Sequence, residues 1–439
     1  MPVPFDCSAQ HRHRLAEQTG SAIIPTAGKW EVFLRPFVIA LATLLLVTSG
    51  FGQRPSLKEE KFHGRDAYVL ENPKMRVAAL RGAGHIAEIR LKSSDPQKNV
   101  NPMRVPHYPT IEPWEYDPAK HDTLYGGAVN RILMSGYMGH LLNFPTFGNP
   151  SESEAEAGLG AHGEALAVEW KKERADSNRE GVSLWYSAHL PKTQYNVGRK
   201  LTLPATETVL YIEEWVENLT AFDRPIHWVE HVTFGPPFVE PGKTVLDVSA
   251  TKGEVRRDGG PGDTLQSGPV VWPRGTSLEG QPVSLRAMQT KPHAGTYYAL
   301  LMDPQKEMAY FTMYHQDYRV LIGYIWRTAD YPWIGDWQEN RSNEPAPWER
   351  QVVARGMEFG TTPFGGPMEQ VVEEGSLYGV PLYRWIGSRQ RLTTRYVAFL
   401  AEIPEGFHGV EDLQLADGQI TITERETGSV LTLPSAAEW

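Results

Sequence analysis

Residues 225–240 read Pro-Ile-His-Trp-Val-Glu-His-Val-Thr-Phe-Gly-Pro-Pro-Phe-Val-Glu. The Trp, Val and Thr residues favour a β-strand, and the Gly-Pro-Pro sequence at 235–237 ends it. Side chains alternate along a strand, so one face is predicted to hold His227, Val229, His231 and Thr233, and the other Trp228, Glu230, Val232 and Phe234. Two interpretations of the histidine face are open: a cleft lined for a polar ligand, or histidines that only stabilise the fold.

The same stretch contains His-x-x-Glu-His at 227–231, a pattern found in one class of zinc peptidases. That chemistry requires a helix, because residues four apart then share one face and one metal ion. On a strand the two histidines are roughly 13 Å apart, at about 3.3 Å per residue, and cannot share an ion. We therefore expect neither a metal nor another cofactor.

The rest of the chain is also dominated by β-type patterns. Turn residues separate runs rich in Val, Ile, Thr and aromatic residues, and no long amphipathic helix is evident. The sequence predicts one large all-β domain over residues 53–439. Strands are expected at 68–70, 75–80, 85–91, 164–170, 182–190, 195–203, 208–217, 296–302, 308–314, 318–326, 391–402, 419–423 and 429–433.

Three segments are predicted to lie outside the strands. Residues 93–120 form a long loop, 252–292 form an excursion or lid, and 331–349 form a second, aromatic and acidic loop. The sequence Asp303-Pro-Gln-Lys-Glu307 is predicted to join two neighbouring strands as a hairpin.

Composition narrows the class of ligand. The chain has 439 residues, a net charge of -10 and no basic run in its body, so nucleic acid is not an expected partner. It has 13 Trp, 18 Tyr and 15 Phe. Aromatic rings stack on the C–H faces of sugars, which makes a carbohydrate the expected ligand, although most of these residues fill the core. The oligomeric state is not evident from the sequence.

The first 52 residues are predicted to be a leader with a secretory signal peptide. Lys29 and Arg35 precede an apolar run at 36–48, and small residues follow at 49–52. The run is short for a membrane span, so no stable span is expected after cleavage, and the protein should be periplasmic or secreted. An uncleaved signal anchor is the alternative. The single cysteine, Cys7, would be removed, leaving no thiol in the mature chain.

Several motifs occur in an order that resembles the galactose mutarotase-like superfamily, the aldose 1-epimerases and their relatives. The resemblance extends roughly from residue 65 to 435. The motifs are Asn130-Arg-Ile132, Gly160-Ala-His-Gly-Glu164, the paired runs 199–203 and 209–218, His231-Val-Thr-Phe234, and Glu358 after Arg355-Gly-Met. Thr233 replaces the aromatic residue usual in the family, and no clear counterpart of its substrate-binding aspartate is found.

The resemblance implies a large antiparallel β-supersandwich in which His231 is the general acid and Glu358 the general base. The predicted function is an exported aldose 1-epimerase-like protein that interconverts sugar anomers by opening the ring. The alternatives are a non-catalytic carbohydrate-binding module on the same fold and a sugar lyase relative. Glu358 has the alternative of a surface carboxylate, and Arg199 that of a cross-strand charge partner. The predicted sugar contacts are Arg131, His162, Arg199, His227, Trp333 (or Trp337) and Asp336.

Overall fold

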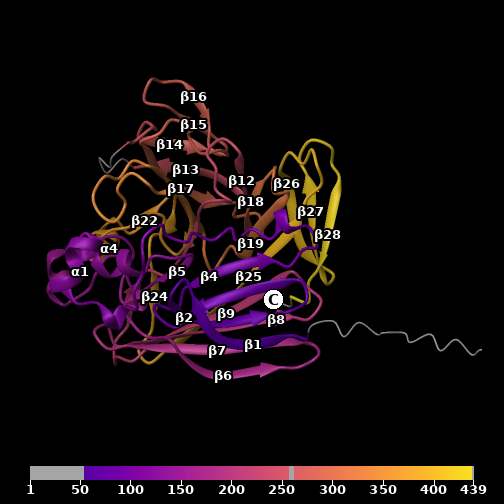
Figure 1. Cartoon of the computed structure of the whole chain (residues 1–439). Coiled ribbons are helices and arrows are strands. Elements are labelled where there is room, and N and C mark those ends of the chain that lie inside the picture. Colours follow the sequence, from indigo (N-terminus) through magenta and orange to yellow (C-terminus); the bar gives the residue numbers. More distant parts are fainter. Residues whose placement is uncertain (1–53, 257–261, 438–439) are drawn as a thin grey trace, which may run out of the picture. The chain divides into compact units, whose positions relative to one another are not determined.

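The computed structural model describes residues 54–256 and 262–437; the predicted leader lies outside them (Figure 1). Two large antiparallel sheets account for most strands. The larger, in spatial order, contains β1 (Ser56–Phe62), β2 (Arg65–Glu71), β3 (Met75–Leu80), β4 (Ile86–Leu91), β5 (His140–Asn143), β11 (Val229–Phe234), β21 (Val353–Gly360), β20 (Trp333–Asn340), β17 (Ala294–Met302), β13 (Ala250–Val255), β14 (Gly268–Val271), β15 (Arg274–Thr276) and β16 (Pro282–Ser284).

The second sheet has eight strands. In order these are β12 (Thr244–Val248), β18 (Met308–His315), β19 (Val320–Arg327), β25 (Arg391–Glu402), β9 (Val209–Asn218), β8 (Tyr195–Pro204), β7 (Gly181–Leu190) and β6 (Lys171–Ser177). A three-stranded sheet follows near the C-terminus: β26 (Val410–Ala416), β27 (Gln419–Glu424) and β28 (Val430–Pro434). Two small pairs join β10 (Arg224–Ile226) to β24 (Arg384–Ile386), and β22 (Ser376–Leu377) to β23 (Val380–Pro381).

Helices are short and lie in the connections. They are α1 (Pro118–Tyr125), α2 (Arg131–Gly136), α3 (Glu152–Glu156) and α4 (Met368–Glu374), with 3-10 turns η1 (Pro96–Lys98), η2 (Pro113–Glu115), η3 (Ala128–Asn130) and η4 (Ala165–Ala167). Within the described ranges, no helix has the length and apolar character needed to cross a membrane.

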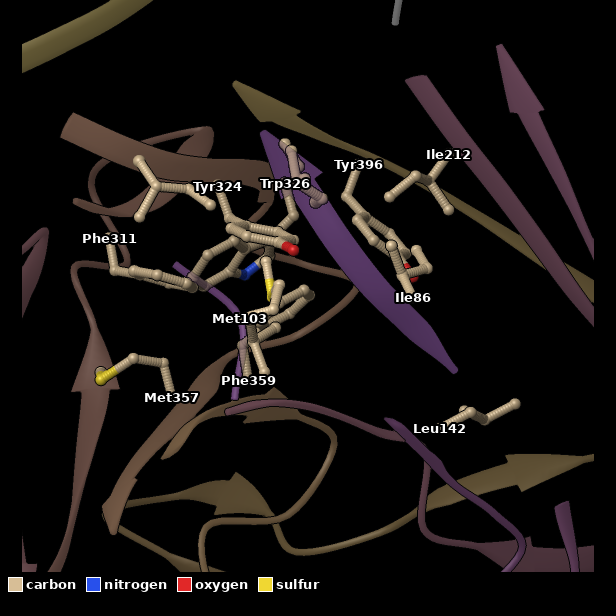
Figure 2. Packing of buried hydrophobic residues seen from close by; sticks show 14 of the residues in the cluster. Ile86, Met103, Leu142, Ile212, Phe311, Tyr324, Trp326, Met357, Phe359 and Tyr396 are labelled. Atoms are coloured by element: carbon tan, nitrogen blue, oxygen red, sulfur yellow. The ribbon is translucent and has the colours of Figure 1, made fainter. Parts of the chain in front are cut away.

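The main hydrophobic core lies between the two large sheets. Phe359 of β21 stacks on Trp326 of β19, with ring centroids 4.3 Å apart, and Tyr324 and Phe311 pack beside them (Figure 2). Alternation explains why strands of both sheets contribute: every second side chain points inward. In β7, for example, Val182, Leu184, Tyr186, Ala188 and Leu190 are buried, and the residues that alternate with them point outward. The predicted all-β class and large antiparallel sandwich are confirmed.

Most predicted strands are confirmed with small shifts of their ends, most clearly β7, β8 and β9 in the second sheet. The predicted strand at 164–170 is wrong. The 3-10 turn η4 occupies its centre, and the indole of Trp170 folds back to donate to the carbonyl of Ala165, 3.0 Å away. The strand predicted from residue 225 onward is interrupted at 227–228, which separates β10 from β11.

Two predicted loops contain strands, which polar or turn-forming residues concealed. The 331–349 loop contains β20, and the 252–292 excursion supplies strands of the larger sheet. The predicted hairpin at 303–307 is wrong. This segment joins β17 of one large sheet to β18 of the other, so it connects the two layers and the strands that it joins are not paired with each other. The 93–120 segment is a largely irregular connection, as predicted, interrupted by η1, η2 and the start of α1.

Candidate active site

The register of two strands in the larger sheet brings His231 and Glu358 together. β11 pairs with β21 in antiparallel fashion, and His231 stands directly opposite Glu358. Side chains of directly opposed residues are close neighbours on one face of a sheet. Val232 and Phe234 of β11 enter the main core, so the pair lies on the face turned away from that core. Two residues predicted from separate parts of the chain therefore meet by strand pairing.

The two side chains are in direct contact. Nε2 of His231 lies 2.8 Å from Oε1 of Glu358. Their exposed fractions are only 5% and 3%, so little water competes for this bond. Gly356 makes the approach possible, because a Cβ there would lie 3.0 Å from the imidazole of His231 and 3.2 Å from the carboxylate.

The second carboxylate oxygen of Glu358 is buried without a hydrogen-bond partner among the described residues. The phenol of Tyr297 is nearby, but it donates to the carbonyl of Pro363, 2.7 Å away. Burial and the charge of Glu358 raise the pKa of Tyr297 well above its ordinary value, so this phenol stays protonated. An unpaired carboxylate oxygen is expensive to bury, and a ligand hydroxyl would satisfy it.

The other nitrogen of His231 is held by hydroxyl groups. Oγ1 of Thr233 lies 3.0 Å from Nδ1 of His231 and 2.9 Å from the phenol oxygen of Tyr137. A hydroxyl both donates and accepts, so Thr233 can serve the neutral imidazole as a donor and the imidazolium as an acceptor. The arrangement supports His231 in either protonation state.

His162 completes the set of histidines around the pair. Its ring lies 5.5 Å from that of His231, nearly perpendicular to it. Its Nδ1 accepts from the backbone N–H of Gly148, 3.2 Å away, which leaves the proton of the neutral ring on Nε2. Burial, with a smaller contribution from His231, lowers the pKa of His162 to about 3. His162 is therefore a neutral hydrogen-bond donor at physiological pH.

Three aromatic residues surround the pair. Trp337 of β20 lies 6.3 Å from the ring of His231, and Trp348 lies 5.9 Å from Trp337 and 6.2 Å from Tyr137. The guanidinium of Arg104 lies 4.4 Å from the ring centroid of Tyr137. Trp348 belongs to the connection between β20 and β21, so that connection contributes to the cover of the pair.

Arg199 and Asp336 are not brought to the pair. Arg199 is fully buried in the main core, where it bonds to Glu214 and Glu230. Glu230 faces the opposite side of β11 from His231, which places Arg199 behind the strand. Asp336 likewise points to the core face of β20 and accepts from Nε of Arg355 at 3.1 Å. The expected sugar contacts at these two positions are replaced by buried ion pairs.

Three further predicted contacts interact with residues other than the pair. Trp333 shares the face of His231, but α4 and the β22–β23 hairpin bury it, and its indole donates to the carbonyl of Pro381. His227 precedes β11 and is buried, with Nδ1 accepting from the N–H of Phe147 at 3.1 Å. Arg131 is half-exposed on α2, 3.9 Å from Asp122. Of the two tryptophans considered, Trp337 is the one beside the pair.

Sequence reasoning did not identify Tyr137, Trp348 or Arg104. Each belongs to a segment whose composition was distinctive: the Gly- and aromatic-rich stretch 125–148, the aromatic loop 331–349 and the long connection 93–120. Only the fold shows which aromatic residue of each segment reaches the pair.

No group of three or more His, Cys, Asp or Glu side chains within the described ranges is arranged to hold a metal ion. None of residues 227–231 is helical, so they lack the geometry that the zinc-peptidase interpretation requires.

Solved structures show the same architecture. A candidate aldose 1-epimerase from Klebsiella pneumoniae is similar with a TM-score of 0.54 and 10% identity, over 79% of this chain and 83% of that chain. A galactose mutarotase-like protein from Clostridium acetobutylicum gives 0.51 and 11%, over 80% of this chain and 99% of that chain. This chain has the galactose mutarotase-like fold.

That fold is not confined to one kind of protein. A TPR-domain containing protein from Parabacteroides distasonis is similar with a TM-score of 0.50 and 10% identity, over 83% of this chain and 51% of that chain. No protein-family model and no curated protein sequence matches the chain. Galactose mutarotase-like architecture therefore leaves the activity to be argued from the site itself.

Proposed function

We propose that the protein is an aldose 1-epimerase-like enzyme in which His231 and Glu358 act as acid and base on one sugar. The observation that carries the proposal is their 2.8 Å contact, with an unpaired oxygen on Glu358. The anomeric hydroxyl and the ring oxygen of a pyranose are attached to the same carbon. A sugar can therefore exchange the direct histidine–carboxylate bond for one bond to each of its two oxygens.

The proton balance assigns the starting states. Glu358 begins as a carboxylate and takes the proton of the anomeric hydroxyl. His231 begins as an imidazolium and gives its Nε2 proton to the ring oxygen, while the bond between C1 and that oxygen breaks and C1 becomes a carbonyl. After rotation about C1–C2, the open-chain hydroxyl attacks the other face of C1, returns its proton to His231, and the new anomeric oxygen takes the proton from Glu358. Positioned proton transfer of this kind contributes roughly a hundred- to ten-thousand-fold.

The surrounding residues have distinct tasks in this scheme. Thr233 accepts from the Nδ1 proton of the imidazolium at 3.0 Å and so supports the acid form. His162 donates from Nε2 to a sugar hydroxyl. Trp337 offers a ring face to the C–H groups of the sugar, and Trp348 limits access of water. These roles need no nucleotide and no redox step.

The test is to measure mutarotation of a panel of free aldoses by polarimetry or by NMR saturation transfer. His231→Asn and Glu358→Gln conserve much of the side-chain volume, and we expect both to slow anomer exchange to the uncatalysed rate while unfolding like wild type. If the wild type accelerates no aldose in the panel, or if both variants remain fully active, the catalytic assignment is wrong.

One observation favours a non-catalytic carbohydrate-binding protein as the second candidate: the pair is almost closed off by its aromatic neighbours. A binding protein needs the aromatic residues and His162, but not the exchange of protons. Sugar binding by the wild type without any acceleration of mutarotation, retained in Glu358→Gln, would favour this candidate.

We also propose that the protein acts after export, on the basis of the charged, apolar and small-residue pattern before residue 53. Mass spectrometry of protein recovered outside the cytoplasm should give a mature N-terminus near Gln53. An intact N-terminus in a cytoplasmic fraction would contradict export.

A further inference from the structure

The second large sheet has an outer face that is only half covered. Strands β26–β28 pack over β18, β19 and the later part of β25, burying Tyr310, Leu321, Val397 and Phe399 (Figure 1). The outward side chains of β7, β8, the later part of β9 and the start of β25 have no such layer among the described residues, whereas Val209 and Tyr211 at the start of β9 pack against the C-terminal strands. This bare half lies behind the main core, on a different sheet from His231 and Glu358.

A groove of about 910 Å³ runs over this bare half. Its volume is within the range of ligand sites in proteins. Three tryptophans contribute to its lining: Trp185 of β7, Trp215 of β9 and Trp114 of η2. Polar side chains lie between them, among them Ser187, Asn196 and Thr393. The groove shares no lining residue with the aromatic set around the His231–Glu358 pair.

Strand register explains the floor of the groove. Ser187, Gly198, Trp215 and Thr393 stand in one row across four neighbouring strands. The indole of Trp215 lies directly on Gly198, because a Cβ at that glycine would meet its ring atoms at 2.4–2.7 Å. The guanidinium of Arg391 lies over the ring of Trp215, 4.0 Å from its centroid, and presents N–H donors to the groove. The row therefore presents a flat floor with donors along it.

Trp114 stands apart from this floor. It is 48% exposed, which is unusual for so large an apolar side chain. It makes no ring or cation contact with any other described residue, and about half of its surface is open to solvent. An exposed indole at the wall of a polar groove is suited to stacking, because it contributes a large contact area at little conformational cost.

The charges around the groove are nearly balanced. Its lining carries the cations Lys171 and Arg391 and the carboxylates Glu169, Glu173 and Glu213. The cations are already paired, Arg391 with Glu217 at 3.1 Å and Lys171 with Glu169 at 3.5 Å. The lining itself offers a polyanion no unpaired positive charge, although Lys200 lies over the ring of Trp185, 5.0 Å from its centroid, and a strongly cationic ligand would find only a small excess of negative charge.

We infer that this groove binds a neutral oligosaccharide chain. Aromatic faces contact the C–H faces of the sugar rings, and the hydroxyl, amide and guanidinium groups bond to the sugar hydroxyls. The groove would hold several linked sugars outside the acid/base site and keep the protein on a polymer or glycan surface. The inference rests on the groove alone and holds whether or not His231 and Glu358 catalyse mutarotation.

The experiment measures binding of maltohexaose, cellohexaose and mannohexaose to the full protein by saturation-transfer NMR and calorimetry, with an oligogalacturonate of equal length as the charged comparison. We expect at least one neutral hexasaccharide to bind and the oligogalacturonate not to bind. Trp114→Ala should weaken binding about tenfold or more, because it removes the exposed indole that would stack on a sugar ring. Because Trp114 is exposed, its removal should leave folding intact.

Two matched variants separate the possible outcomes. Trp385→Ala removes another tryptophan, 55% exposed on β24 and outside the groove, and should leave binding unchanged. Glu358→Gln should also leave it unchanged. The inference is overturned if no neutral hexasaccharide binds, if Glu358→Gln abolishes binding while Trp114→Ala does not, or if sedimentation shows a dimer that Trp114→Ala dissociates, since a second copy of the chain would then occupy the groove.

Discussion

Replacing Thr233 with Val removes the only hydroxyl that contacts Nδ1 of His231 among the described residues and keeps the volume of the side chain. Thr233 is fully buried, so water cannot replace the lost bonds at 3.0 Å to His231 and 2.9 Å to Tyr137. A hydrogen bond to a charged group contributes about 1.5–3 kcal/mol. Because the proposed mechanism starts from the imidazolium, kcat/KM should fall about ten- to a hundredfold at neutral pH.

Mutarotation of Thr233→Val should be measured beside wild type and Thr233→Ser, which restores the hydroxyl. We expect kcat/KM to fall in the valine variant and to return in the serine variant. Thermal unfolding of the three proteins should be compared, so that a loss of folding is not mistaken for a loss of chemistry. An unchanged kcat/KM in Thr233→Val would refute the role of the hydroxyl.

Three further predictions concern the support of the site. Arg199→Met leaves Glu230 buried without its cation and should lower the free energy of unfolding by about 3–5 kcal/mol, measured by urea denaturation. Arg391→Met, at an exposed position, should change that free energy little. Equal stability of the two variants would show that Arg199 does not stabilise the fold through this network. Burial lowers the pKa of His227 to about 4, so the folded state resists its protonation. The contribution of this group to stability is complete above about pH 6.5, and about 3 kcal/mol of it should be lost by pH 4. His227→Asn should reduce that loss, and an acid unfolding profile unchanged in this variant would contradict the prediction. Trp348→Ala should speed the modification of His231 by diethylpyrocarbonate, measured by peptide mass spectrometry. An unchanged rate of modification would show that this indole does not cover the pair.

Sequence patterns predicted the second sheet better than the larger one. β7, β8 and β9 alternate cleanly because one face meets the core and the other meets solvent. β20 and β21 are buried along almost their whole length, so alternation of polarity gives no signal there. β20 also carries Asp336 toward the core, where Arg355 neutralises it. In a sequence, a charged residue of this kind indicates a loop. Its place in a buried strand is evident only when the structure shows the oppositely charged partner.

For the site, the sequence predicted the two groups that carry the proposed chemistry. Most of the sugar contacts predicted around them lie elsewhere in the structure. His231 and Glu358 are 127 positions apart, and only their motifs suggested that they act together. Arg199 and Asp336 were chosen as polar residues in suggestive segments, and polarity does not reveal which face of a strand a side chain occupies. Tyr137 reaches His231 from the end of α2 through a connection that has no periodic pattern.

The buried network and the proposed acid/base pair lie on opposite faces of β11. Glu230 is bonded to Arg199 at 2.9 Å, to His140 at 2.8 Å and to the phenol of Tyr396 at 2.9 Å, all on the core side of β11. A slip of β11 by one residue would turn His231 into the core and Glu230 toward the aromatic cover, at the cost of every one of these bonds. Burial of an ion network is a weak source of stability in itself. We infer that here it specifies register, and register sets His231 opposite Glu358, so the network positions the proposed acid/base pair without touching it.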